Sequence, residues 1–207
     1  MAGFIGKYLL PREIDFNKAL LNQARLGRSM VEELYQACVD EDKDRLASLS
    51  TAAMQARKLK AKNMGQLLDV FITPYDKESI YRMITQLDWV TLSVKHFVLE
   101  TDLYDIHELA EYEPILRTLA TMAIALEKGI ANLPSKTLGI IAPKIDQVHD
   151  LYDEVVETCA KTTATLLAQD DIKHIIRHKD ILLQLKEIAK RLHISANTLE
   201  DMAIKIV

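Results

Sequence analysis

Apolar residues recur every three or four positions along most of the chain, which is the spacing of a helix face packed against other helices. The first such stretch runs from Phe16 to Cys38, and Asp15 before it is a residue type that caps helix starts. A second stretch extends from about Glu41 to Phe71, with Lys and Arg on its other side. The pattern therefore predicts two long amphipathic helices in the first third of the chain.

The string FITPYDKES marks the start of a third helix. Thr73 is a suitable N-cap, and Pro74 fits the first helical position because its missing N–H costs nothing there. Asp76 places a negative charge in the first turn, where the helix dipole favours it. We therefore expect the third helix to begin at this turn with Thr73 as its cap, and its apolar stripe to end near Val98.

Three further helices are expected in the second half of the chain. Their expected bounds are Leu109 or Pro114 to Leu133, Ser135 or Lys136 to about Gln169, and Asp170 or Asp171 to the C-terminus. The middle helix must tolerate Pro143 in its interior, where the ring removes a hydrogen bond and favours a kink.

Six helices of similar length with short connections predict antiparallel packing. Helices one to three span about 13–100 and helices four to six about 107–207, with similar turn placement. This similarity indicates two three-helix bundles, packed end to end or side by side. No linker-like stretch separates them, so we expect an all-α protein that forms a single domain over residues 1–207.

Composition and charge exclude several classes of protein. Only 11 of 207 residues are Gly or Pro, which argues against a turn-rich β-sandwich or barrel. The net charge of −4 gives no broad cationic field, so we expect no nucleic-acid binding. No apolar run approaches a membrane span, which favours a cytoplasmic protein. Cys38 and Cys159 stand alone and are expected to be small buried side chains.

The sequence carries no pattern typical of a catalytic site. It has no GxSxG motif and no cluster of glycines that could cradle a phosphate, so we expect no enzymatic activity. Potential metal ligands are densest on the fifth helix, at Asp146, His149, Asp150, Asp153 and Glu154. His149 and Asp153 are four residues apart and could share one metal, or the set could be a solvated acidic face. His174 and His178 are also four residues apart, and they could likewise share a transition metal or be a solvated pair.

Three strings resemble the PhoU-like accessory proteins associated with Pit-type phosphate transporters. They are GKYLLPREIDFNKAL, FITPYDKESIYRMITQLDWV and HKDILLQLKEIAKRLHISANTLEDMAIKIV. The family pattern has a Leu-Pro before a Phe that opens helix one, a Phe-Ile-Thr-Pro-Phe/Tyr-Asp turn, and a late Ala-Asn pair. The counterparts are Leu10-Pro11 with Phe16, the turn from Phe71 to Asp76, and Ala196-Asn197. The resemblance implies two three-helix bundles, often oligomeric, that accompany a phosphate transporter.

Family members also carry E/DxxxD motifs that hold metal ions, because carboxylates four residues apart project from one helix face. The eight corresponding positions here are Ala53, Arg57, Asp88, Leu92, His149, Asp153, Lys186 and Lys190. The resemblance therefore leaves Asp88, His149 and Asp153 as weak remnants of metal sites. We expect no cofactor and at most one weakly held metal ion. Alternatively, the cations at these positions could make the same face an anion site.

The run RKLKAK concentrates positive charge on the second helix, at Arg57, Lys58, Lys60 and Lys62. It could meet acidic lipid headgroups or a transporter loop, or it could be a solvated helix face. With Lys186 and Lys190, these residues are the candidate contacts for an anion or a partner.

The resemblance implies a non-catalytic cytoplasmic protein, peripheral at the inner membrane, that regulates inorganic phosphate transport by contact with a Pit-type permease. It also implies a homo-oligomer. The alternative is a PhoU-like helical scaffold that has lost metal binding and the phosphate connection.

Overall fold

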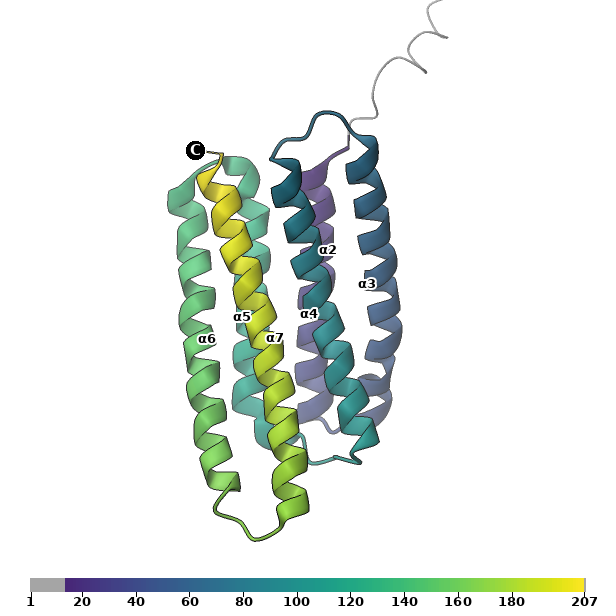
Figure 1. Ribbon diagram of the computed structural model, residues 1–207, viewed down its shortest axis with the longest axis vertical. Helices are drawn as coiled ribbons and strands as arrows, with labels where there is room; N and C mark the ends of the chain where they lie inside the picture. Colours follow the sequence, from purple (N-terminus) through teal and green to yellow (C-terminus); the bar gives the residue numbers. More distant parts are fainter. Residues whose placement is uncertain (1–13, 207) are drawn as a thin grey trace, which may run out of the picture.

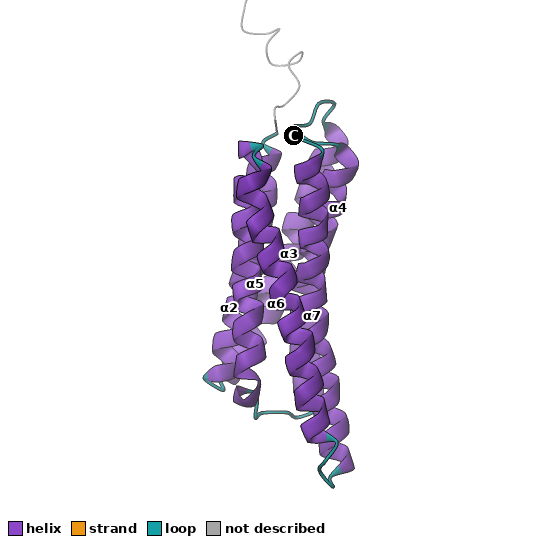
Figure 2. Ribbon diagram, turned by 90° about the vertical axis from the view of Figure 1, so that its left-hand side faces the viewer, coloured by secondary structure: helices purple, strands orange, loops and turns teal. Residues whose placement is uncertain are grey.

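The computed structural model describes residues 14–206, which form six α-helices and no strand (Figures 1 and 2). The helices are α2 (Phe16–Val39), α3 (Lys43–Asp69), α4 (Lys77–Leu103), α5 (Glu113–Asn132), α6 (Leu138–Leu166) and α7 (Ile172–Ile204). The prediction of an all-α fold is confirmed. The predicted counterpart Leu10-Pro11 lies outside the described residues.

Four of the helices begin at an aspartate whose carboxylate accepts a hydrogen bond from a backbone N–H of the first turn. These N-caps are Asp15, Asp42, Asp76 and Asp171. Such caps satisfy backbone donors that have no partner inside the helix. The predicted cap Asp15 is therefore confirmed, and of the two candidates Asp170 and Asp171 the cap is Asp171.

The predicted cap of the third helix was wrong. This helix, α4, begins at Lys77 rather than at Pro74, and the carboxylate of Asp76 accepts the Ser79 N–H at 3.3 Å. The Thr73 hydroxyl instead donates to the Tyr75 carbonyl oxygen at 2.6 Å. Tyr75 is buried and its hydroxyl donates to the side chain of Asn17 on α2. This tertiary anchor holds Thr73 to Tyr75 in a non-helical connection, so the helix starts later.

The second half follows the predicted order with small shifts at the helix ends. A 3₁₀ turn, Ala110–Tyr112, precedes α5, which carries Pro114 in its first turn. Lys136 has a left-handed backbone with φ of 52°, so α6 cannot begin there and starts at Leu138 after a second 3₁₀ turn, Leu133–Ser135. The helix then continues through Pro143, as predicted.

The helices form two three-helix units that lie side by side (Figure 1). The first unit contains α2, α3 and α4, and the second contains α5, α6 and α7. Helix α4 packs along α7, and α2 packs along α5, so the inner helices of the two units share one continuous core. Of the two arrangements left open by the sequence, the side-by-side one is therefore present. Helix α3 packs on α2 and α4 and lies at the edge of the molecule.

A buried polar network fixes the first unit. The Gln23 side-chain amide donates to the Ile84 carbonyl oxygen at 2.7 Å, and the Asn63 amide donates to the Gln23 side-chain oxygen at 2.9 Å. Both side chains are almost completely buried. Because buried amides are costly unless they are paired, this network ties α2, α3 and α4 together at one height.

Candidate functional site

The structure places the strongest metal-site candidate, His149 on α6, against His193 on α7. The two ring centroids are 4.7 Å apart, and the Tyr152 ring lies tilted against His193 with centroids 4.5 Å apart. The antiparallel pairing of α6 and α7 brings these residues together from positions far apart in sequence. The sequence analysis missed His193. Its place beside the apolar residues of the last helix was a signal that it would be partly buried.

Two nitrogen atoms in this cluster have unused hydrogen-bonding capacity. Among residues 14–206, His149 Nε2 and His193 Nδ1 are buried and have no hydrogen-bond partner. Burial lowers the pKa of His193, the neighbouring His149 lowers it further, and Asp153 opposes the shift. Neutral imidazole is the form that binds a metal ion. The pair therefore has the chemistry of two nitrogen ligands, with the Asp153 carboxylate supplying nearby negative charge.

A complete metal centre needs more ligands than this pair supplies. Within residues 14–206, no group of three or more His, Cys, Asp or Glu side chains is arranged to hold a metal ion. The third metal-site remnant predicted from sequence is Asp88 on α4. It forms an ion pair with Lys60, in which Lys60 Nζ lies 2.8 Å from Asp88 Oδ2. The three predicted metal residues therefore do not form one site, because Asp88 is engaged within the first unit.

The predicted anion or partner contacts are also divided. Arg57, Lys58 and Lys62 are exposed on α3, whereas Lys60 turns inward to Asp88. Lys186 on α7 lies beside Cys159, where its charge opposes the burial that raises the pKa of that thiol to about 11. Lys190 is exposed on the same helix. The α3 cations thus form one group, and the α7 cations lie in the other unit.

A second histidine cluster lies at the end of the second unit. The rings of His174 and His178 stack with centroids 3.9 Å apart. His178 is buried, with Nδ1 2.8 Å from a Glu111 carboxylate oxygen and 2.5 Å from the Tyr112 hydroxyl. Burial lowers the pKa of His178, although Glu111 opposes the shift. The sequence analysis found the histidine pair but missed Glu111 and Tyr112, which only the packing of the 3₁₀ turn against α7 brings to it.

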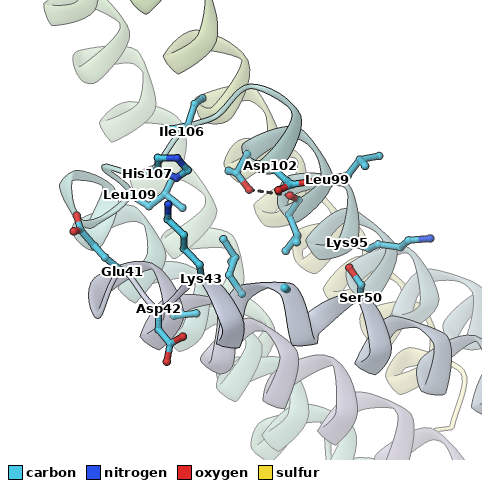
Figure 3. Close-up of a pocket in the computed structure, with 15 residues that line it drawn as sticks. Glu41, Asp42, Lys43, Ser50, Lys95, Leu99, Asp102, Ile106, His107 and Leu109 are labelled. Carbon is cyan, nitrogen blue, oxygen red and sulfur yellow. Dashed lines mark hydrogen bonds between the residues drawn. The ribbon is translucent and has the colours of Figure 1, made fainter.

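A cavity of about 250 Å³ opens between the C-terminal part of α4 and the N-terminal part of α3. Its walls are mainly apolar, and its rim carries both signs of charge. Figure 3 shows Lys43 extending toward His107 and Leu109, whereas Lys95 points away from the cavity. The sequence analysis did not predict this cavity, because its walls come from residues 37–50 and 95–109. The cavity has room for a small apolar group. Because its rim carries both positive and negative side chains, it favours neither an anionic nor a cationic ligand.

Comparison with known proteins identifies relatives by structure only. No family model matches the chain, and no curated protein matches it. A PhoU-like protein from Shewanella oneidensis MR-1 has a solved structure that superposes with a TM-score of 0.76 at 12% identity, over 92% of this chain and 99% of that one.

A second solved structure from Shewanella oneidensis MR-1, described as a PhoU-like phosphate regulatory protein, gives a TM-score of 0.77 at 12% identity. It matches over 91% of this chain and 98% of that one. At this identity the likeness concerns the arrangement of helices and not the chemistry of a site. This chain therefore has the fold of PhoU-like proteins along almost its whole length.

Proposed function

We propose that this protein is a non-catalytic accessory protein that regulates inorganic phosphate transport by contact with a Pit-type permease. The observation that carries the proposal is the end-to-end match to a protein described as a PhoU-like phosphate regulatory protein. The match covers 91% of this chain and 98% of that one, so it extends over both three-helix units. The proposal places the protein in the cytoplasm, at the inner face of the membrane, as a homo-oligomer.

The thiols give support to the non-catalytic part of the proposal. Burial raises the pKa of Cys38 to about 12, and burial raises that of Cys159 to about 11. A nucleophilic cysteine needs a lowered pKa and access to substrate. Neither thiol meets these requirements, so both are better suited to packing than to chemistry.

The proposal includes at most one weakly held metal ion per chain. His149 and His193 would be its two protein ligands, with the Asp153 carboxylate nearby, since the two rings lie side by side and each has a buried nitrogen that lacks a partner in residues 14–206. Metal analysis after dialysis tests this part. Loss of bound zinc on dialysis supports it, whereas two or more retained transition-metal ions per chain would contradict it.

The experiment that tests the function measures phosphate uptake in cells that lack the protein. We expect the deletion to change uptake of radiolabelled phosphate and the wild-type protein to restore it. We also expect a tagged protein to recover a Pit-type permease from detergent-solubilised native membranes. If the permease contact lies on α3, Lys58→Glu should reduce the amount of permease recovered with the tagged protein. Lys190→Glu, on α7, should recover as much permease as the wild type.

The competing function is a helical scaffold without a connection to phosphate. It is favoured by the non-ligating residues at Ala53, Arg57, Lys186 and Lys190, where the family resemblance predicts carboxylates. Unchanged phosphate uptake in the deletion strain, together with no recovered permease, would favour this scaffold and reject the proposed function.

A further inference from the structure

Helix α3 carries an unusual concentration of one sign of charge. The 24 residues from Arg45 to Leu68 contain no Asp or Glu, although the whole chain has a net charge of −4. Their five cations are Arg45, Arg57, Lys58, Lys60 and Lys62. Acidic residues elsewhere in the chain must therefore neutralise these cations, or the helix presents a positive surface.

Only part of this charge is neutralised by the fold. Arg45 pairs with Glu33 and Asp40, and Lys60 pairs with Asp88. Within residues 14–206, Arg57, Lys58 and Lys62 make no ion pair and are exposed. The three free cations therefore leave α3 with a positive outer side that its own bundle does not compensate.

The free cations share the outer side of α3 with exposed apolar and small residues. Successive residues of an α-helix are rotated by 100° about its axis. This spacing puts Arg57, Lys58 and Lys62 on or next to the side of α3 that faces away from α2 and α4. We define the α3 face as the exposed residues Met54, Arg57, Lys58, Ala61, Lys62, Gly65, Leu68 and Asp69, in which three cations outnumber one carboxylate. Figure 1 shows that this helix lies at the edge of the molecule, where its outer side meets no other element.

The α3 face continues into an apolar tip formed by Leu68, Phe71 and Ile72. Their side chains are 84%, 88% and 86% exposed, more than any other large hydrophobic residue that the structure describes. Phe71 and Ile72 lie between the buried residues Val70 and Tyr75, which anchor the connection on the core. The connection thus presents Phe71 and Ile72 to the surroundings in a fixed position.

The opposite end of the molecule provides a contrast. Leu167, Ile172 and Ile176 are also exposed there, but the connection between them contains Asp170 and Asp171. Carboxylates repel an anionic surface, whereas the α3 face has cations beside its apolar tip. Lys173 and Arg177 are exposed beside Ile172 and Ile176, but Asp170 and Asp171 equal them in number, whereas on the α3 face Asp69 alone opposes Arg57, Lys58 and Lys62.

We propose that the α3 face and its apolar tip dock directly on an anionic lipid bilayer. Arg57, Lys58 and Lys62 bind the headgroup phosphates, and Phe71 and Ile72 enter the boundary between headgroups and acyl chains. Helix α3 then lies along the membrane surface, with Ala61 and Gly65 allowing close approach. This inference deepens the proposed function, because it supplies membrane attachment that does not depend on the permease.

A lipid bilayer explains the combination of free cations and an exposed apolar tip better than a second copy of the chain does. A symmetric dimer through the α3 face would bring six unpaired cations against one another with only the two Asp69 carboxylates to offset them. A convex apolar tip also needs a complementary groove in a protein partner, whereas a fluid lipid interface accepts it without one.

The test is co-sedimentation of the full chain with vesicles that contain no protein. With about 30% phosphatidylglycerol in phosphatidylcholine, we expect binding at about 50 mM salt that falls steeply at about 500 mM, because salt screens exposed charges. Pure phosphatidylcholine vesicles should bind about tenfold less protein, or less still. Equal binding to both vesicle types would contradict the role of the cations.

Two variants separate the contributions of the tip and the cations. Phe71→Ser with Ile72→Ser, and Arg57→Glu with Lys58→Glu and Lys62→Glu, should each reduce binding about tenfold or more. All five positions are exposed, so the variants should melt at the wild-type temperature.

Matched controls change equivalent residues elsewhere. Leu167→Ser with Ile172→Ser removes exposed apolar residues at the other end, and Lys128→Glu with Lys173→Glu and Lys179→Glu reverses three exposed charges on α5 and α7. The apolar control should bind as the wild type, and the charge control should lose much less binding than the α3 variant. If folded wild-type protein does not bind anionic vesicles, or if the tip variant only changes the oligomeric state, the proposal is rejected. Either result leaves the phosphate-uptake test unaffected, since these vesicles contain no permease.

Discussion

In the first three-helix unit the buried Asn63 amide donates to the Gln23 side-chain oxygen, whereas in the second unit the adjoining His149 and His193 rings each have a buried nitrogen without a partner within residues 14–206. Both pairs lie between antiparallel helices. The difference indicates that polar residues in the first unit fix the packing of the helices. The His149–His193 pair of the second unit keeps binding capacity that packing does not use.

The largest expected effect comes from breaking the amide network. Asn63→Ala leaves the Gln23 side-chain oxygen buried without its donor and opens a small cavity, so the free energy of unfolding should fall by about 2–3 kcal/mol. Urea titration measures the change. The control Gln66→Ala alters the same helix at a half-buried amide outside the network. Equal stability of the Asn63→Ala variant and the control would show that the network does not fix the first unit.

The second prediction compares two helical glycines, one in each unit. A Cβ at Gly129 on α5 would lie 2.6 Å from Leu199 Cδ2 on α7, whereas a Cβ at Gly65 on α3 would meet nothing within 4 Å. Gly65→Ala should raise the unfolding free energy by about 0.5–1 kcal/mol through helix propensity. Relative to it, Gly129→Ala should be less stable by about 1–3 kcal/mol, because it overpacks the second unit. Thermal melts that give both variants the same stability would contradict this close approach.

The third prediction separates the real cap of α4 from the one predicted by sequence. Asp76→Ala should lower the urea midpoint more than Thr73→Ala, because the Asp76 carboxylate accepts the Ser79 N–H whereas the Thr73 hydroxyl bonds within the preceding connection. Asp76→Asn is the control, since asparagine also caps helices, and it should retain most of the stability. A Thr73→Ala variant less stable than Asp76→Ala would instead support the sequence-based start of the helix.

The smallest expected effect is a pH dependence located in the second unit. Burial lowers the pKa values of His178 and His193 in the folded protein below the ordinary value of about 6.5. As the pH falls below that value, the unfolded chain takes up protons first. Stability is therefore full above about pH 6.5 and is lost as the pH falls through the lowered folded values.

Histidine replacements test this assignment by urea titration between pH 5 and pH 8. His193→Gln should flatten the dependence, because it removes one of the two histidines whose pKa burial lowers. An unaltered slope in the His193→Gln variant would remove His193 as a source of the effect.

The sequence also predicted two features that depend on local chemistry alone. Asp15 is the cap that its position before an apolar repeat indicated, and Asp171 is one of the two candidates for the last helix, because a cap acts on the backbone two or three residues away. The buried stripe that includes Leu20, Val31 and Leu34 likewise follows from helical periodicity. These interactions lie within one helical turn or repeat, so one segment at a time determines them.

The candidate sites were less predictable, because their members come from different helices. His149 was identified, but its neighbour His193 is 44 positions later and reaches it only when α6 and α7 pair. Asp88 and Lys60 were assigned to a metal remnant and a partner contact, and the α3–α4 packing joined them to each other instead. The availability of a charged side chain therefore depends on which opposite charge the fold brings to it.

By itself, the sequence determined the all-α class, the order of the helices and most of their starts, because hydrophobic periodicity and capping act over a few residues. Tertiary structure alone decided that the units lie side by side, that Tyr75 delays the start of α4, and which cations of α3 stay free. These three features depend on contacts between residues far apart in the sequence, because each is set by the shape and charge of a surface that another helix supplies.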